Sequence, residues 1–416
     1  MPAVVQVKKG GKPEKGRKLR GSNPAVQGRK PGRKQKTKKL SLKQYKTQQR
    51  KLYSGDKVDH QQRVDRQGGQ VNLADFIDPD VATKELLCHG FTRKPCCPGC
   101  GHDSLQGPFE RPGRQALGRH WRCDDPGCRY WVNVLSGAKW LDSVCRFRSL
   151  TPGRLWHAVC LYTSQKCPSR QSVASGLGPA GPKIAQLVMD ALRKLESDAA
   201  IKSNSRLRLD GPIEVDATSV STFRIGKNSH AFAPEIRGWV RRKKKRTPQY
   251  FLTHFRLAGM VQRGNKGKLV VKKLRFVLLP PGGRPAPESL QDVRDADFLR
   301  RVKKPAVIFA DGAKSWRSES KRLGLTFRSV SHYKMEFVRG TTVKKKRAIS
   351  GTQLLDQVWR QMKRCLPSSL ATRDGETRRG SSRLATYIYS FVFRYNNRTA
   401  LRAAVAKLAR ARNAAQ

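Results

Sequence analysis

The chain has 416 residues, enough for two or three domains, and 87 Lys and Arg against 30 Asp and Glu give it a formal net charge of +57 at pH 7. So large a positive excess repels itself unless a polyanion is bound, which makes nucleic acid the expected partner. No stretch approaches the roughly 20 apolar residues that span a bilayer, and the N-terminus lacks the apolar segment of a secretory signal, so we expect no membrane partner.

The N-terminal segment is strongly basic. Its first 50 residues hold 17 Lys or Arg and a single acid, Glu14, with many Gly, Pro and Gln and almost no apolar periodicity. This composition predicts a disordered basic arm over residues 1–60. The basic clusters at 8–20 and 29–39 favour non-specific DNA binding and nuclear import over a solvated tail without a role. The expected location is the nucleus if the host is eukaryotic, and otherwise the cytoplasm or nucleoid.

Two close cysteine pairs mark residues 71–148 as a zinc ribbon region. The first knuckle is CPGCG at 97–101, and CDDPGC at 123–128 supplies the second pair. Two thiolates three positions apart can bind one tetrahedral ion, and the separation of 23 positions between Cys100 and Cys123 suits a ribbon. Four protein ligands leave no open position for catalysis, so the ion is expected to be structural. The predicted Zn²⁺ ligands are Cys97, Cys100, Cys123 and Cys128.

The other cysteines have no partner at ligand spacing. Cys96 and His102 could each replace a knuckle ligand, but either choice spoils the spacing. Closely paired cysteines in a basic, apparently unsecreted chain indicate metal ligands in a reducing compartment. The remaining cysteines are therefore expected to be free thiols, buried or at the surface: Cys88, Cys145, Cys160, Cys167 and Cys365.

Residues 149–205 carry helical signals and are predicted to form a helix-turn-helix-like DNA-binding region. Thr151 and Pro152 are typical of an N-cap and a first helical residue. Further on, the apolar residues of 184–195 recur at the spacing of one helix face. Two or three short helices joined at 176–181 would form this region.

From residue 211 the pattern changes to strands, and a catalytic domain is expected over 211–398, followed by a basic tail at 399–416. The predicted elements are strands at 213–217, 250–261, 268–279, 306–310 and 325–330, and helices at 288–302, 352–364 and 382–395. The order is three strands, a helix, two strands and then helices. It suits the RNase H-like fold, an α/β fold in which three antiparallel strands lead into parallel strands with flanking helices.

Three aspartates in this domain point to metal chemistry. Asp216 and Asp311 each end an apolar strand, where a carboxylate either accepts hydrogen bonds from a loop or binds a metal. For either one alone, capping is the better interpretation. Asp356 shifts the balance, because it lies on a predicted helix with Lys363 on the same face, placed to meet a phosphate. Three carboxylates can hold two Mg²⁺ or Mn²⁺ ions about 4 Å apart for in-line attack on a phosphodiester.

Over residues 94–398 the order of motifs resembles the zinc-ribbon DDE transposases of bacterial insertion sequences and eukaryotic Merlin-type elements. After the two knuckles come YWVNVLSG at 130–137, the helix of Leu155 and Trp156, IEVDATSV at 213–220, FADG at 309–312, Ser331-His332 with Glu336-Phe337, TQLLDQVWRQMKR at 352–364 and FVFRYNNR at 391–398. The resemblance implies a homo-oligomer that cleaves double-stranded DNA at terminal inverted repeats and joins the 3′-hydroxyl to target DNA.

The chain departs from the family pattern at three positions. Ala217 and Gln353 stand where Glu and Asn are common, and Asp356 replaces the usual Glu. Aspartate still binds Mg²⁺, so activity is expected, and the same-fold alternative is a catalytically inactive, domesticated DNA-binding protein. A zinc-ribbon protein of the ribosomal or transcription type is the rival of another class, but it gives the three acids no role.

A run of six basic residues, RRKKKR, is expected in a loop between the first two strands of the catalytic domain. It could grip DNA phosphates or act as an import signal, and a solvated charge run is an equal alternative. The residues assigned to DNA on this ground are Arg241, Arg242, Lys243, Lys244, Lys245 and Arg246.

Overall fold

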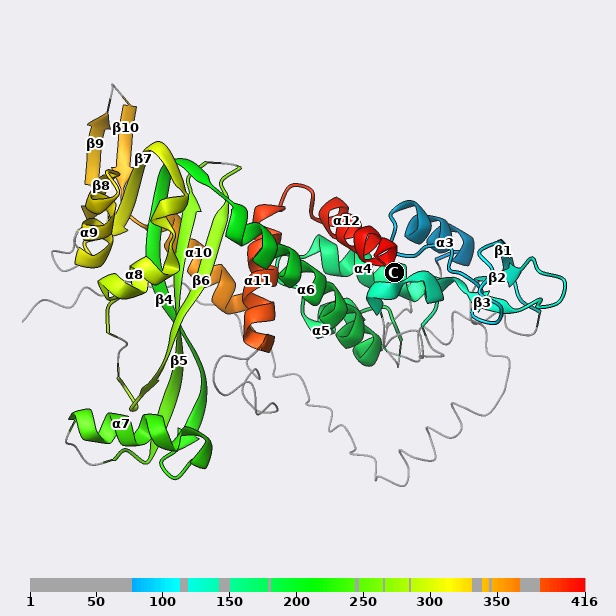
Figure 1. The fold of residues 1–416 in the computed structure, drawn as a ribbon, viewed down its shortest axis with the longest axis horizontal. Helices are drawn as coiled ribbons and strands as arrows, with labels where there is room; N and C mark the ends of the chain where they lie inside the picture. The colour runs from blue at the N-terminus through cyan, green and yellow to red at the C-terminus, as the bar shows by residue number, and fades with distance from the viewer. Residues whose placement is uncertain are drawn as a thin grey trace, which may run out of the picture. The chain divides into compact units, whose positions relative to one another are not determined.

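The computed structural model describes residues 77–415 apart from 113–118, 142–149, 179–180, 244–246, 265, 284–285, 331–338, 344–345 and 367–381. It is a mixed α/β protein with a small three-stranded sheet, a group of helices and a five-stranded sheet (Figure 1). The arm predicted at 1–60 lies outside the described residues. None of the described helices combines the length and the apolar character needed to cross a bilayer.

The small antiparallel sheet has the order β1-β2-β3 and follows helix α3 (Pro79–Cys88). Its strands are β1 (Leu105–Glu110), β2 (Arg119–Cys123) and β3 (Trp131–Asn133), followed by the 3₁₀ turns η3 (Val134–Gly137) and η4 (Lys139–Leu141). Trp121, Val132 and Val134 form its core together with two of the predicted zinc ligands, Cys97 and Cys123. So small a core is typical of a domain that relies on a metal.

Three helices follow: α4 (Pro152–Ser164), α5 (Arg170–Ala174) and α6 (Gly181–Arg206). Thr151 is the N-cap of α4, because its side chain accepts the Arg154 N–H at 3.2 Å, and Pro152 is the first helical residue as predicted. Helix α6 has 26 residues and is not one of the short helices expected here. It packs against α4 and α5 and also against helices α11 and α12 from the end of the chain.

The predicted basic tail at 399–416 contains a packed helix instead, α12 (Leu401–Ala414). Val405, Ala406 and Ala409 are buried against the helical group. These residues sit at helical spacing among Lys and Arg, but alanines give too weak an apolar signal for the sequence to predict the helix. The helical group is therefore completed by the last residues of the chain.

The five-stranded sheet has the order β6-β5-β4-β7-β8. Its strands are β4 (Leu209–Gly226), β5 (Tyr250–Gln262), β6 (Leu269–Leu279), β7 (Val302–Asp311) and β8 (Thr326–Val330). The pairs β4–β5 and β5–β6 are antiparallel, whereas β4–β7 and β7–β8 are parallel. All five strands coincide with predicted ones, but β4 continues to Gly226 and pairs with β5 as a long hairpin (Figure 1). Asp216 therefore lies within its strand, and the prediction that it ends the strand was wrong.

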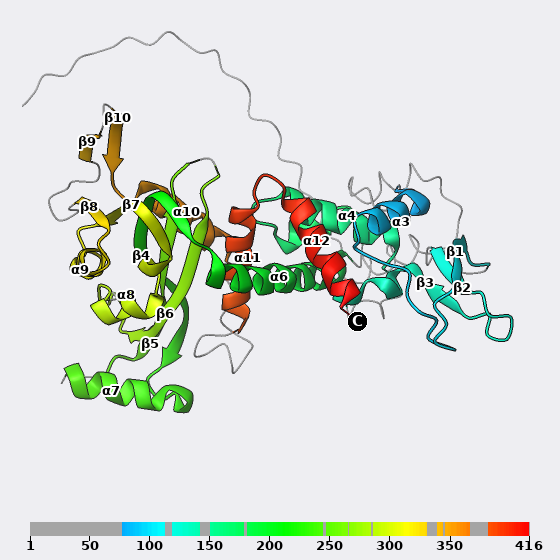
Figure 2. The ribbon, with the colours of Figure 1, turned by 45° about the horizontal axis from the view of Figure 1, so that its top comes forward.

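Helices cover both faces of this sheet (Figure 2). Helices α10 (Gln353–Cys365) and α11 (Ser382–Asn396) bury one face, against residues such as Phe255 and Leu257. The opposite face is buried under α8 (Leu290–Ala296) and α9 (Lys314–Arg322). Helix α8 is shorter than the predicted 288–302, because Asp297 has the left-handed φ of 53° and ends it before the 3₁₀ turn η6 (Leu299–Arg301).

Two parts of this domain were not predicted. The β4–β5 hairpin carries η5 (His230–Phe232) and helix α7 (Ala233–Lys243), and β9 (Arg339–Val343) pairs with β10 (Lys346–Ser350). The prediction that RRKKKR lies in a loop was wrong for its first three residues, which end α7, and Lys244, Lys245 and Arg246 lie outside the described residues. Helix α7 forms because its apolar side chains join a separate small core of Ile225, Phe232, Ile236, Trp239, Phe251 and Leu278.

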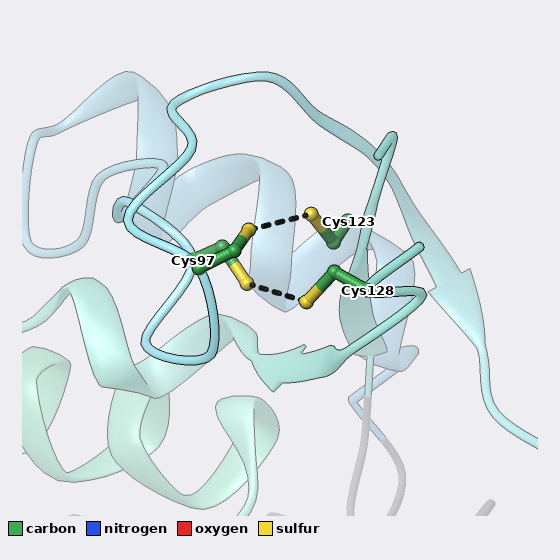
Figure 3. A group of neighbouring side chains, drawn as sticks. Cys97, Cys123 and Cys128 are labelled. Carbon is green, nitrogen blue, oxygen red and sulfur yellow. Dashed lines mark hydrogen bonds between the residues drawn. The ribbon is translucent and has the colours of Figure 1, made fainter. Parts of the chain in front are cut away.

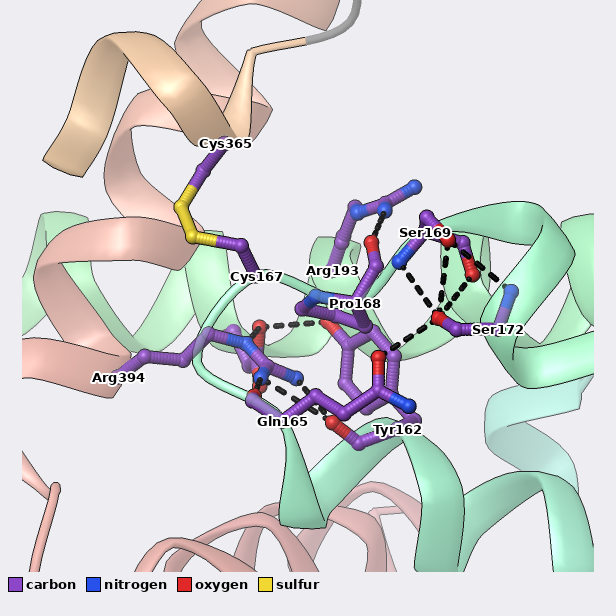
Figure 4. Close-up of a disulfide and its surroundings, with 10 residues drawn as sticks. Tyr162, Gln165, Cys167, Pro168, Ser169, Ser172, Arg193, Cys365 and Arg394 are labelled. Atoms are coloured by element: carbon purple, nitrogen blue, oxygen red, sulfur yellow. Dashed lines mark hydrogen bonds and ion pairs between the residues drawn. A yellow bond between two sulfur atoms is a disulfide. The ribbon is translucent and has the colours of Figure 1, made fainter. Parts of the chain in front are cut away.

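Cys167 and Cys365 form a disulfide, so the prediction of free thiols was wrong for these two residues (Figure 4). Their Cα atoms lie 5.0 Å apart although their sequence separation is 198 positions. No local spacing can indicate such a pair, because only the fold brings the α4–α5 loop to the end of α10. The disulfide joins the helical group to the helix that carries Asp356.

Candidate functional site

The four predicted zinc ligands converge. The Sγ atoms of Cys97 and Cys128 lie 3.6 Å apart, as do those of Cys100 and Cys123, and all four sulfurs are within 4.8 Å of one another (Figure 3). A tetrahedral ion with Zn–S bonds of about 2.3 Å places its sulfurs roughly 3.8 Å apart. The cluster is therefore consistent with a structural zinc. Cys96 is exposed and stands outside it.

Local hydrogen bonds to backbone N–H groups shape both knuckles. In the first, Gly101 donates to the Cys97 carbonyl at 2.8 Å, and its φ of 77° favours glycine. In the second, the Asp125 side chain accepts the Gly127 N–H at 2.9 Å. Burial opposes ionisation of Cys97, but N–H groups of Cys100 and Gly99 lower its pKa to about 7. A thiol that is half ionised near pH 7 is a ready metal ligand, whereas burial raises the pKa of Cys123 to about 12, so a bound metal would have to displace its proton.

Cys123→Ser is expected to lose the zinc and to unfold the ribbon, because a structural zinc contributes about 10–16 kcal/mol of binding energy that the small core cannot replace. Cys96→Ser is the matched control, since this neighbouring thiol is exposed and outside the cluster. Elemental analysis of zinc per chain and thermal unfolding would measure both effects. A Cys123→Ser protein with the zinc content of the wild type would remove the assignment.

Asp216 and Asp311 occupy equivalent positions on adjacent parallel strands. Glu214 pairs with Phe309 in the β4–β7 ladder, and each aspartate lies two residues further along its strand. Because side chains alternate along a strand, both point to the face that Glu214 occupies, under α10. One oxygen of Asp311, Oδ1, is buried and has no hydrogen-bond partner among the described residues. A buried carboxylate oxygen without a donor fits a cation ligand.

Helix α10 meets Asp216 through an aromatic side chain. The Trp359 Nε1–H donates to Asp216 Oδ2 at 2.9 Å, which fixes the orientation of that carboxylate. A Cβ atom at Gly259, the β5 partner of Asp216, would lie 2.5 Å from the Trp359 ring, so only glycine admits the indole. Asp356 lies in the first turn of α10, where the Thr352 hydroxyl donates to it at 3.4 Å.

The acids interact electrostatically as one cluster. Burial, followed by the charges of Asp311, Asp356 and Glu288, raises the pKa of Asp216 to about 8. Lys363, seven residues after Asp356 on α10, faces the same cluster. Desolvation and then Arg256 lower its pKa, whereas Asp216 and Asp356 raise it. Lys363 does not neutralise all of the repulsion among these carboxylates. Binding of a divalent cation would relieve the rest.

Glu288 is a fourth acid that the sequence did not reveal. It forms an ion pair with Arg256, and both side chains are less than 10% exposed, at 7% and 9%. Burial raises the pKa of Glu288, Arg256 lowers it, and Asp311 raises it. Glu288 follows a segment rich in Pro and Gly and stands just before the N-cap Ser289 of α8, where nothing in the sequence signals burial.

Comparison with family models, curated proteins and solved structures finds no match for this chain. The assignment of the acids therefore depends on their geometry. Among the described residues, the four cysteines are the only group of three or more acid, His or Cys ligands gathered tightly enough to hold an ion. The three aspartates are electrostatic neighbours at a wider spacing, and their shared use of a cation stays a prediction. Glu336 and Asp374, the other acids considered as a third ligand, lie outside the described residues.

Without metal, the difference in stability between Asp216→Asn and wild type is expected to shift in favour of the variant as pH rises. Asp216 keeps its proton in the folded chain up to a pKa of about 8, whereas an unfolded chain releases it near about 3.9. Between these values the folded state binds more protons, so wild-type stability falls with rising pH and the neutral asparagine avoids that loss. Thermal midpoints in chelator at about pH 5 and about pH 8 would measure the difference. A difference independent of pH would contradict the raised pKa of Asp216.

Proposed function

We propose that this protein is a DDE-type DNA transposase, which cleaves double-stranded DNA at element ends and joins the 3′-hydroxyl to target DNA. The observation that carries the proposal is the placement of Asp216 and Asp311 side by side on parallel strands, under the helix that bears Asp356 and Lys363. Carboxylates that converge from two strands and a helix can hold two Mg²⁺ or Mn²⁺ ions for phosphoryl transfer. Bound there, the ions would activate the attacking oxygen and neutralise charge on the leaving oxygen.

The topology of the five-stranded sheet supports this proposal. Three antiparallel strands, β6, β5 and β4, lead into the parallel strands β7 and β8, which is the strand arrangement of the RNase H-like fold. Asp216 lies on the central strand β4 and Asp311 ends its parallel neighbour. The family resemblance assigns its first two acids to these same residues. A zinc-ribbon protein of the ribosomal or transcription type has no use for this arrangement.

Different residues of the chain would bind the metal ions, orient their ligands and contact the DNA phosphate. Asp311 offers a buried oxygen without a donor, and Trp359 orients the carboxylate of Asp216. Lys363 adds a positive charge two turns beyond Asp356 on the same helix face, where it would contact the phosphate that enters the site. The net charge of +57 would supply sequence-independent affinity for the DNA backbone.

A catalytically inactive DNA-binding protein with the same fold is the second candidate. It is favoured by the wider spacing of the three aspartates and by Asp356, which is one methylene shorter than the family's glutamate. Both candidates share double-stranded DNA as the partner, assembly as a homo-oligomer on that DNA, and a nuclear location in a eukaryotic host.

Nicking of terminal-repeat DNA separates these candidates. The inverted repeats that flank the gene supply the duplex, and a scrambled repeat and a chelator supply the controls. We expect Mg²⁺-dependent strand breaks at the repeat end, followed by joining of the new 3′-hydroxyl to a target plasmid. Repeat-specific binding without breaks would support the inactive protein. Binding without any repeat preference would support the ribosomal or transcription class.

A further inference from the structure

A buried carboxylate links the strand of the first acid to the helix of the third. Glu214 lies two residues before Asp216 on β4, and its side chain is 3% exposed. Its Oε2 accepts the backbone N–H of Leu355 at 2.9 Å, and Leu355 immediately precedes Asp356. One side chain therefore spans the distance between the two elements that carry these acids.

The contact with Leu355 supplies a missing helix cap. The first N–H groups of a helix have no partner within it, and a polar side chain at the N-cap usually accepts from one of them. Thr352, the N-cap of α10, makes no such bond. Glu214 takes its place from a distant strand by accepting from the third helical residue, and its negative charge suits the positive end of the helix.

Arg263 completes the link. Its Nε donates to Glu214 Oε1 at 2.8 Å, and its Nη2 donates to the carbonyl of Gly351 at 2.8 Å, just before α10. Its guanidinium also lies 3.9 Å from the ring centroid of Phe309, two residues before Asp311 on β7. Glu214 itself lies two positions before Asp216, Leu355 directly precedes Asp356, and Phe309 lies two positions before Asp311. Glu214 and Arg263 therefore reach the immediate sequence neighbourhood of all three acids.

We propose that Glu214 and Arg263 are positioning residues, which set the place of Asp356 against Asp216 and Asp311 for divalent-metal binding; this inference rests on the proposed function. Both oxygens of Glu214 accept hydrogen bonds from groups next to the acids, so its role in this proposal is to orient the ligands. Hydrogen bonds that orient metal ligands typically change metal affinity about 10–100-fold when removed. The pair determines how closely the third acid approaches the other two.

Glu214→Gln tests the pair, because it keeps the size of the side chain and removes the charge. Glu319→Gln is the matched control: Glu319 is 4% exposed and paired with Arg294 and Arg322, but it lies on α9 across the sheet. Both variants lose a buried carboxylate charge, so both are expected to lose stability. Glu214→Gln alone is expected to bind Mn²⁺ about 10–100-fold more weakly by calorimetry, and to need correspondingly more Mg²⁺ for nicking.

Hydrogen exchange supplies a readout without metal or activity. The Leu355 amide is expected to exchange faster in metal-free Glu214→Gln than in wild type and in Glu319→Gln, since a neutral acceptor holds it less strongly. High Mn²⁺ should restore nicking by Glu214→Gln but not by Asp216→Ala. Arg263→Lys, which keeps the charge but cannot reach Glu214 and Gly351 together, tests the same point if Glu214→Gln fails to fold.

The outcomes separate the two proposals. If wild type binds Mn²⁺ and Glu214→Gln, or Arg263→Lys in its place, binds it equally well, the positioning role is wrong and the transposase proposal stands. If wild type binds no Mn²⁺ beyond what Asp216→Ala binds, the metal chemistry of the proposed function fails, and the positioning role fails with it.

Discussion

Alanine at Asp216, Asp311 or Asp356 is expected to reduce Mg²⁺-dependent nicking by at least about 10²–10³-fold, as losing a group that stabilises charge in the transition state does. Affinity for terminal-repeat DNA should stay near the wild-type value, because phosphates are bound by Lys and Arg and removal of an acid lessens repulsion. Nicking and binding measured on the same duplex would show the separation. Asp356→Glu, which restores the residue usual in the resembled family, should retain activity.

Asp190→Ala is the matched control for these variants, because Asp190 is a 50%-exposed acid on α6, outside the carboxylate cluster. It should nick like wild type. Full activity in Asp356→Ala would show that the third ligand is another acid, and Glu288 is then the first to replace, since it already acts on Asp216 and Asp311. Full activity in Asp216→Ala would end the two-metal proposal.

Affinity for DNA should fall by about 10³–10⁵ between roughly 50 and 200 mM salt if six to ten phosphates are contacted, because bound Lys and Arg release counterions. Deleting residues 1–60 should weaken binding to every sequence about equally and flatten the salt dependence. Fluorescence anisotropy on terminal-repeat and scrambled duplexes would measure both quantities. If the deletion variant lost the preference for the repeat, the arm would instead contribute to sequence-specific DNA recognition.

The basic end of α7 offers a more local version of this test. Arg241 and Arg242 are exposed, and each phosphate contact that is lost should lower the salt slope by about 0.9. Arg241→Gln with Arg242→Gln should therefore flatten the slope without changing the preference for the repeat. An unchanged slope would identify the run as a solvated charge cluster.

Local patterns in the sequence were sufficient where chemistry and periodicity coincide. The two knuckles indicated their ligand set because zinc geometry demands short spacings between thiolates. The apolar run at 306–310, just before Asp311, indicated a strand because a strand buried on both faces is apolar throughout. The bounds of the amphipathic helix from Gln353 could likewise be predicted, because its apolar residues recur at helical spacing. The structure buries four of them, Leu355, Val358, Trp359 and Met362.

What the sequence did not predict depends on contacts between distant residues. In the sequence, Glu214 is only a polar residue two positions before the catalytic candidate Asp216. It becomes a helix cap because the fold brings the N–H of Leu355 to its side chain. Glu288 is buried by Arg256, a residue on another element. Helix α7 is stabilised by a core that includes residues of both hairpin strands, Ile225 and Phe251, so its eleven residues alone carry too little apolar surface to predict it.

The helical group has a consequence for how the chain folds during synthesis. Its early helices, α4 and α6, share a core with α11 and α12, and the whole five-stranded sheet is encoded between them. Asn413 even donates to the Gly90 carbonyl at 3.0 Å and accepts the Lys139 N–H at 2.9 Å. A ribosome adding about 5–20 residues per second needs roughly 10–35 s to pass from α6 to α11. During that interval the apolar face of α6 that α11 and α12 later cover is exposed to solvent. A nascent or truncated chain is therefore expected to be a substrate for chaperones.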